Sequence, residues 1–222
     1  MAAIAEDATL DEIRAGLAPE LPKNAAFDGW TAKAVTAAAD SAGVDPDVAA
    51  LAFPDGAVDR IDAWFAYVDA EMARALPAEK LATMKIRERI TALVEQRLTT
   101  LAPEREALRR ALAILAMPQN IPAATKLGWR AADRMWRLAG DTATDYNHYT
   151  KRTMLAGIYA ATLSVFLDDE SEDWAETRAF LARRIDGIMR FEKAKAKLTG
   201  RMQGDHKLSL SRFIGRLRHP AI

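Results

Sequence analysis

Residues 38–56 read AADSAGVDPDVAALAFPDG, and this stretch decides the expected fold. The alanine-rich segment favours a helix that stops at Gly43, and a short helix near 46–53 ends at Pro54-Asp55-Gly56. A helix, a glycine turn and a second short helix over residues 29–53 have the spacing of a helix-turn-helix. The sequence therefore predicts this motif near the N-terminus, ahead of a long helix.

Helical patterns continue on both sides of this stretch. Apolar residues recur at helical spacing, and Pro and Gly mark the ends of each segment. Predicted helices cover residues 8–18, 27–42, 46–53, 57–76, 80–102, 104–117 and 122–138. The next helix is capped by Thr142 or Thr144 and reaches Leu167. Another begins at a capping box of Asp173 and Glu176 and ends at about Leu198, and the last covers residues 205–218. No strand pattern or internal repeat accompanies them. We therefore expect an all-α protein with three parts: N-terminal helices with the helix-turn-helix (1–76), a helical core (77–199), and a glycine joint with an amphipathic helix (200–222).

Composition limits the class of protein. The 222 residues are 50% hydrophobic, which is enough for one domain with a sizeable core. The absence of cysteine excludes disulfides and thiolate chemistry. The 14 uncharged residues Met154–Leu167 fall short of the roughly 20 that span a bilayer. The acidic N-terminus resembles neither a secretory signal nor a transit peptide. These features predict a cytoplasmic, bacterial-type protein, peripheral on the inner face of the membrane.

Charge is balanced overall but divided between the two ends of the chain. Residues 1–70 contain 13 Asp or Glu and four Lys or Arg, whereas residues 190–222 contain nine Lys or Arg and two acids. Such an asymmetry indicates an anionic partner for the basic end, either nucleic acid or a membrane.

The predicted last helix has an apolar stripe with basic flanks, an arrangement that suits a membrane surface with anionic lipid. Packing on the protein's own domain or on a second subunit is the alternative. The predicted membrane-contact residues are Lys207, Leu210, Arg212, Phe213, Ile214, Arg216, Leu217 and Arg218.

The helix-turn-helix lacks the charge that DNA binding needs. Its second helix and flanks, GVDPDVAALAFPDG, contain three aspartates and no cation, and would be repelled by phosphate. We expect a helical scaffold there and no nucleic-acid partner.

No motif for catalysis or metal binding is present. The histidines are His148, His206 and His219, and no second Glu-x-x-His pair complements Asp145 and His148. A glycine-rich phosphate loop and a nucleophile elbow are also missing. We expect a protein that is not an enzyme, with no catalytic residues, no metal and no cofactor other than a bound isoprenoid or phospholipid.

The segment 141–167 divides into a polar, aromatic-rich half and an uncharged half, MLAGIYAATLSVFL. A helix that is uncharged all round is buried or lines a cavity. The alternative for each residue is ordinary core. The predicted lipid-pocket residues are Leu155, Ile158, Tyr159, Thr162 and Phe166. The polar half, with Tyr146 to Tyr149, has the composition of a partner surface.

Two resemblances follow from these residues. AADSAGV, the short helix and AFPDG resemble the N-terminal module of the TetR repressor family. GWTAKAVTAAADSAG, AMPQNIP and the block from DRMWRLAGDTATDYNHYTKR to DDESEDWAETRAFLARRI resemble the ninth Coq protein family, the lipid-binding accessory proteins of ubiquinone biosynthesis, over about residues 27–195.

The second resemblance implies a TetR-like bundle with a degenerate helix-turn-helix, a homodimer, an isoprenoid pocket and a diiron demethoxyubiquinone hydroxylase as partner. The family's partner patch maps onto Met135, Leu138, Asp145, Asn147, His148 and Tyr149. Family members commonly have Asn-Trp-Tyr where this chain has Asn147-His148-Tyr149. This difference affects the expected contact with the hydroxylase.

The leading hypothesis is a non-catalytic protein that extracts an isoprenoid quinone precursor, or another lipid, from the membrane and presents it to the hydroxylase. The alternative is a TetR-like, ligand-responsive transcriptional regulator, which the helix-turn-helix spacing favours. An enzyme acting alone is the third option, and the missing catalytic motif counts against it.

Overall fold

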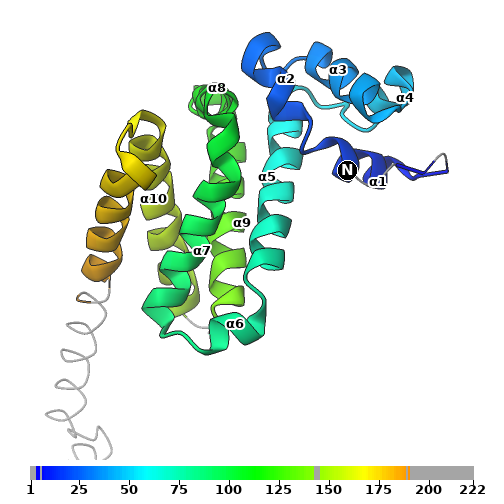
Figure 1. Ribbon diagram of the computed structural model, residues 1–222. Helices are drawn as coiled ribbons and strands as arrows, with labels where there is room; N and C mark the ends of the chain where they lie inside the picture. The colour runs from blue at the N-terminus through cyan, green and yellow to red at the C-terminus, as the bar shows by residue number, and fades with distance from the viewer. Residues whose placement is uncertain (1–3, 6, 143–145, 189, 191–222) are drawn as a thin grey trace, which may run out of the picture. The chain divides into compact units, whose positions relative to one another are not determined.

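The computed structural model describes residues 4–5, 7–142, 146–188 and 190. Every regular element among these residues is a helix, which confirms the all-α prediction (Figure 1). The chain divides between Ala182 and Arg183 into two units. The first unit contains α1 to α10, so the predicted N-terminal part and most of the predicted core are one packed body. Of the second unit, residues 183–188 and 190 are described, and they are helical.

Four short helices form the N-terminal module: α1 (Leu10–Leu17), α2 (Leu21–Asp28), α3 (Ala32–Ala42) and α4 (Pro46–Leu51). Thr9 and Glu12 form a capping box that starts α1. The predicted single helix over 27–42 is wrong, because Gly29 has φ 70° and separates α2 from α3. Pro22 does not end a helix but lies in the first turn of α2, where its missing N–H costs nothing.

The helix-turn-helix spacing is confirmed. Helix α3 ends at Gly43, which is left-handed with φ 69°, and the Asp45 carboxylate accepts a hydrogen bond from the backbone N–H of Asp47 at 2.8 Å to start α4. The motif is therefore intact in its backbone.

The long helices of the bundle are α5 (Ala57–Ala75), α7 (Ile86–Leu101), α8 (Arg105–Leu115), α9 (Ile121–Leu138) and α10 (Tyr146–Asp168), and α6 (Ala78–Ala82) connects α5 to α7. Single 3₁₀ turns at Ala102–Glu104 and Pro118–Asn120 precede α8 and α9. The predicted helix over 80–102 is interrupted after Ala82, and the Glu88 carboxylate accepts the Lys85 backbone N–H at 2.8 Å to start α7. Helix α5 packs on α7 and α9, and α9 packs on α10.

Trp30 joins the N-terminal module to the bundle. Its side chain is 2% exposed, its indole Nε1 donates to the Ala107 carbonyl at 3.0 Å, and its ring lies 5.3 Å from that of Trp64. Arg14 adds a second connection, because its guanidinium pairs with Asp59 at 2.5 Å and donates to the Ala52 carbonyl at 3.0 Å. The module is thus part of the folded core.

The corner after α10 is organised by Asp169. This buried carboxylate accepts the backbone N–H groups of Ser171 at 2.9 Å and Thr177 at 2.8 Å, as well as both hydroxyls. The expected capping box at Asp173 is not formed, because Asp173 has φ 50° inside the 3₁₀ turn Glu172–Trp174. Ser171 instead accepts the Glu176 N–H at 3.1 Å, and the next helix starts at Ala175.

Candidate functional site

A cavity of about 290 Å³ lies among α5, α7, α8, α9 and α10. Its volume is at the lower end of the roughly 300–1,000 Å³ of ligand pockets. Its walls are mainly apolar, from Leu112 and Leu115 of α8, Leu127 of α9 and Leu163 of α10. The rim is exposed and carries Ala116, Ile121, Ala160 and Ser164. The bundle therefore contains an apolar cavity that opens to the surface.

Helix α10 turns a different face to this cavity than the pattern predicted. Tyr159 lines it, together with Ala156, Ala160, Leu163 and Ser164. The other predicted pocket residues lie elsewhere: Leu155, Thr162 and Phe166 are buried in the surrounding core, and Ile158 is half-buried.

The uncharged half of α10 is not buried all round, contrary to expectation. Gly157 and Ala161 are exposed, as are Ala160 and Ser164 at the cavity rim. Their side chains are so small that exposing them leaves little apolar area in water. Small residues on one face also allow another helix to approach closely.

The buried end of the cavity is polar. Arg97 of α7 lines it with 1% of its surface exposed, pairs with Asp69 of α5, and has its guanidinium carbon 4.9 Å from the Tyr159 ring centroid. Arg130 of α9 pairs with Asp62 and lies 3.3 Å from Asp69. Two guanidinium groups and two carboxylates therefore balance one another here.

The protonation states at this end follow from burial and these contacts. Burial opposes the charge of Arg97, but Tyr159 and Asp69 outweigh it and hold the Arg97 pKa above its usual value. Burial also raises the pKa of the Tyr159 phenol. At neutral pH Arg97 is thus a cation and Tyr159 a neutral phenol, and the two side chains are hydrogen-bonded to each other.

The sequence pattern did not indicate Arg97 as a site residue, because charged residues on helices usually face water. A signal was available: Arg97 continues the stripe of Ile90, Leu93, Val94 and Leu101, all of which are buried. A charge inside an apolar stripe indicates a buried partner or a ligand.

The predicted partner patch is divided between surface and core. Met135 is fully buried and Leu138 is half-buried, while Tyr149 is 61% exposed. The rings of His148 and Tyr149 lie 6.3 and 6.0 Å from that of Trp129, a residue outside the predicted patch. Asp145 and the Asn147 side chain lie outside what the structure describes.

A buried ion-pair network supports this patch. Arg152, 2% exposed, pairs with Asp133 of α9 at 2.6 Å and Asp141 at 3.0 Å, and Lys151 pairs with Asp141 at 2.7 Å. Arg152 also donates to the His148 carbonyl at 3.1 Å. The network fixes the first turns of α10 against the end of α9.

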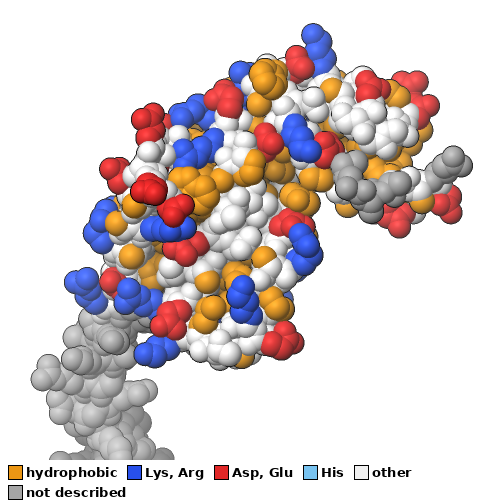
Figure 2. Space-filling model, viewed as in Figure 1, with side chains coloured by type: hydrophobic (Ala, Val, Ile, Leu, Met, Phe, Trp, Pro, Cys, Tyr) orange, Lys and Arg blue, Asp and Glu red, His pale blue; other side chains and the backbone are white. Residues whose placement is uncertain are grey.

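The outer surface of the helix-turn-helix is acidic and apolar. On α4, Val48 is 38% and Leu51 65% exposed, and Asp45 and Asp47 are exposed beside them. The sequence of α4, PDVAAL, contains no Lys or Arg. Acidic side chains surround this end of the unit in Figure 2. The backbone of a helix-turn-helix is therefore present, but the outer surface of α4 lacks the positive charge that binding to DNA phosphates requires.

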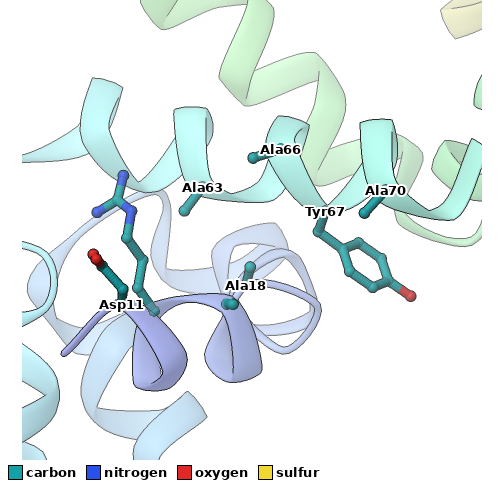
Figure 3. Close-up of a pocket in the computed structure, with 8 residues that line it drawn as sticks. Asp11, Ala18, Ala63, Ala66, Tyr67 and Ala70 are labelled. Carbon is teal, nitrogen blue, oxygen red and sulfur yellow. The ribbon is translucent and has the colours of Figure 1, made fainter. Parts of the chain in front are cut away.

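A second pocket, of about 240 Å³, lies between α1 and α5 (Figure 3). Alanines line most of it, with Ala18, directly after α1, facing Ala63, Ala66 and Ala70 of α5. Tyr67 closes one end and Asp11 lies at the other.

The predicted membrane-contact residues from Lys207 to Arg218 lie outside the described residues. Within the part of the chain that the structure describes, no helix is long and apolar enough to cross a membrane. The same residues contain no group of three or more His, Asp or Glu side chains suited to a metal ion.

A family model described as COQ9 matches residues 121–192. The proteins named "Ubiquinone biosynthesis protein COQ9, mitochondrial" from Rattus norvegicus and Homo sapiens are each 37% identical to this chain. These alignments cover 72% of this chain and 54% and 52% of the relatives. The chain is thus similar to the COQ9 family. It spans about half the length of these curated relatives.

The COQ9 match covers α9 and α10, which form one wall of the cavity and carry the Trp129, His148 and Tyr149 cluster. A COQ9 protein of Drosophila melanogaster is 27% identical over 95% of this chain and 65% of its own length. The crystal structure of a TetR transcriptional regulator from Nitrosomonas europaea matches 78% of this chain and 96% of its own, with a TM-score of 0.62 and 24% identity. It shows the TetR-like fold, as predicted.

Proposed function

We propose that this protein acts in ubiquinone biosynthesis as a non-catalytic carrier that holds an isoprenoid lipid in the bundle cavity and presents it to a demethoxyubiquinone hydroxylase. The observation that carries the proposal is the mainly apolar cavity among α5 and α7 to α10, whose rim is open and whose walls are largely Leu and Ala side chains. Burial of apolar surface of this kind favours an isoprenoid chain.

Two surfaces outside the cavity favour transfer of a lipid to a partner over regulation of transcription. Tyr149 is exposed beside Trp129 and His148, and exposed aromatic residues are enriched at protein interfaces. The acidic surface of α4 would be repelled by a DNA backbone. The proposal includes the hydroxylase as a partner at this aromatic cluster, and a homodimer.

Filling the cavity tests the carrier function. Ala124 of α9 lines the cavity, whereas the next residue, Thr125, is exposed outside it. Ala124→Phe should place a ring in the lipid's volume, and the amount of copurified isoprenoid lipid, measured by mass spectrometry, should fall at least several-fold. Thr125→Phe is the matched control and should retain lipid.

Thermal unfolding of both variants confirms that each is folded. Equal lipid content in Ala124→Phe and the wild-type protein, or no isoprenoid lipid in the wild-type protein after mild purification, contradicts the carrier function.

Membrane contact is proposed for residues 205–222 on sequence grounds. The stripe of Leu210, Phe213, Ile214 and Leu217 gives reversible binding to anionic vesicles, because four apolar side chains are too few for a permanent anchor. Deletion of 205–222 should abolish cosedimentation with phosphatidylserine vesicles and leave the helical circular dichroism of the bundle unchanged.

A variant with Leu210→Ser and Phe213→Ser retains every positive charge. It therefore separates the contribution of the apolar stripe to vesicle binding from that of the positive charges. Weaker binding by this variant supports insertion of the stripe. Full binding to the vesicles after the deletion contradicts the membrane role of the segment.

A further inference from the structure

Helix α4 exposes a pair of apolar side chains that the fold does not use. Of the six residues of this helix, all of which the structure describes, Ala49 alone is buried, whereas Val48 is 38% and Leu51 65% exposed. At about 100° per residue, the two exposed side chains point only about 60° apart around the helix, away from Ala49. Helix α4 packs on α3 and α1, at the outer end of the N-terminal module (Figure 1). The pair therefore forms an apolar ridge that faces outward.

Acidic side chains flank this ridge. Asp47 is exposed and lies about 40° from Leu51 around the helix. Asp45 and Asp55, also exposed, precede and follow α4. Residues 34–58 contain four aspartates and no Lys or Arg. The surface around the ridge is therefore negatively charged.

The cation that approaches α4 from another helix does not cancel this charge. The Arg14 guanidinium donates to the Ala52 carbonyl, directly after α4, but it pairs with Asp59 at 2.5 Å. The aspartates around α4 therefore repel the phosphates of nucleic acids and of anionic membranes, as well as acidic peptides. A cationic partner that also has apolar side chains gains from both the charge and the ridge.

We propose that the outward surface of α4, formed by Val48 and Leu51 with Asp45, Asp47 and Asp55 around them, is a docking site for a basic amphipathic helix of a partner protein. The two apolar residues are three positions apart, a spacing at which the side chains of one helix fit between those of another. The partner's apolar stripe covers the ridge, and its flanking Lys or Arg residues reach the aspartates. This surface and the aromatic cluster lie on different helices.

Three synthetic peptides of about 14 residues test the inference. The first has leucines at helical spacing flanked by lysines, the second has the same composition in scrambled order, and the third has glutamate in place of lysine. In fluorescence anisotropy titrations of the full chain, the first peptide should bind at least about tenfold more tightly than the second, and the third should not bind. Binding of the first peptide should weaken as the ionic strength rises, because salt screens exposed charges.

Leu51→Ser should lower the affinity for the first peptide about tenfold, because the leucine can no longer be buried against it. Phe27→Ser is the matched control and should bind normally, since Phe27 is 85% exposed beside the exposed Asp28 but belongs to α2. Asp47→Asn should lower the affinity about threefold at low salt and less at high salt. Thermal unfolding of each variant verifies that it is folded.

Equal affinity for the ordered and the scrambled peptide overturns the docking of a helix. Unchanged binding by Leu51→Ser, or an equal loss in Leu51→Ser and Phe27→Ser, overturns the assignment to α4. Binding of the glutamate peptide as tightly as the lysine peptide overturns the basic partner. None of these outcomes affects the bundle cavity, so the carrier function is tested separately.

Discussion

Asp169 is a single carboxylate that holds the corner between α10 and the helix that follows. Its two oxygens accept four hydrogen bonds, from the backbone N–H and hydroxyl groups of Ser171 and Thr177. These bonds hold its pKa well below the usual range, although burial acts in the opposite direction. The folded state therefore depends on the ionised form.

Asp169→Asn should lower the free energy of unfolding by about 2 kcal/mol, because the amide nitrogen cannot accept the donors that one carboxylate oxygen receives. Asp168→Asn is the matched control. Asp168 is 76% exposed and only pairs with Arg109, so its loss should cost less than about 1 kcal/mol. Urea denaturation of both variants measures the difference, and equal midpoints would show that the corner does not depend on Asp169.

At the same scale, the sequence predicted some site residues and missed others for identifiable reasons. Tyr159 was found because it lies in an uncharged helix. Periodicity could not decide which face of that helix meets the cavity, since Gly, Ala and Ser occupy the other positions and any face could be the inner one. Arg97 and Asp69 were missed because pairing of charges between α7 and α5 is not visible along the chain.

Among the elements, long helices with clear stops were predicted well, and α5, α8 and α9 match their expected ranges within a residue or two. The errors lie at positions where one residue changes the direction of the chain. Gly29 divides a predicted helix, and Pro22 starts one where an end was expected. Local composition did not indicate that a helix ends at Gly29 or that one begins at Pro22. The packing of Trp30 against α8 and α5 makes both boundaries favourable.

The turn of the helix-turn-helix depends on Gly43. It has φ 69°, and an added Cβ would meet no atom within 4 Å, so only backbone strain opposes substitution. Gly43→Ala should lower the free energy of unfolding by about 1 kcal/mol, and Gly43→Asn by less, because asparagine tolerates the left-handed region. Thermal unfolding of the two variants ranks them, and an alanine variant as stable as the wild-type protein would contradict this account of the turn.

For the whole molecule, the lowered pKa values predict how stability depends on pH. Hydrogen bonds from arginine and lysine outweigh burial and lower the pKa of Asp133 and Asp141, and Asp169 behaves likewise. A carboxylate with a lowered pKa contributes its full stability above its usual pKa near 4, and that stability is lost as the pH falls through its folded value. Glu104, whose pKa is raised by burial, works in the opposite direction, but the carboxylates with a lowered pKa outnumber it.

The free energy of unfolding should therefore be nearly constant around neutral pH and fall steadily below about pH 5. Denaturant titrations at a series of pH values measure this, and the Asp169→Asn variant should show a shallower decline. A stability that rises on acidification would contradict the role of these carboxylates.

Trp30 has a consequence for how freely the helix-turn-helix can change. The inward face of the helix-turn-helix is tied to the bundle through the Ala107 carbonyl and Trp64, whereas its outward face has exposed aspartates and no cation on α4. The two faces therefore carry different physical constraints: folding fixes the residues of the inward face, whereas the outward face can change its chemistry without disturbing the core. The helix-turn-helix is thus a structural part of the bundle, and removing it would expose the Trp64 ring to solvent.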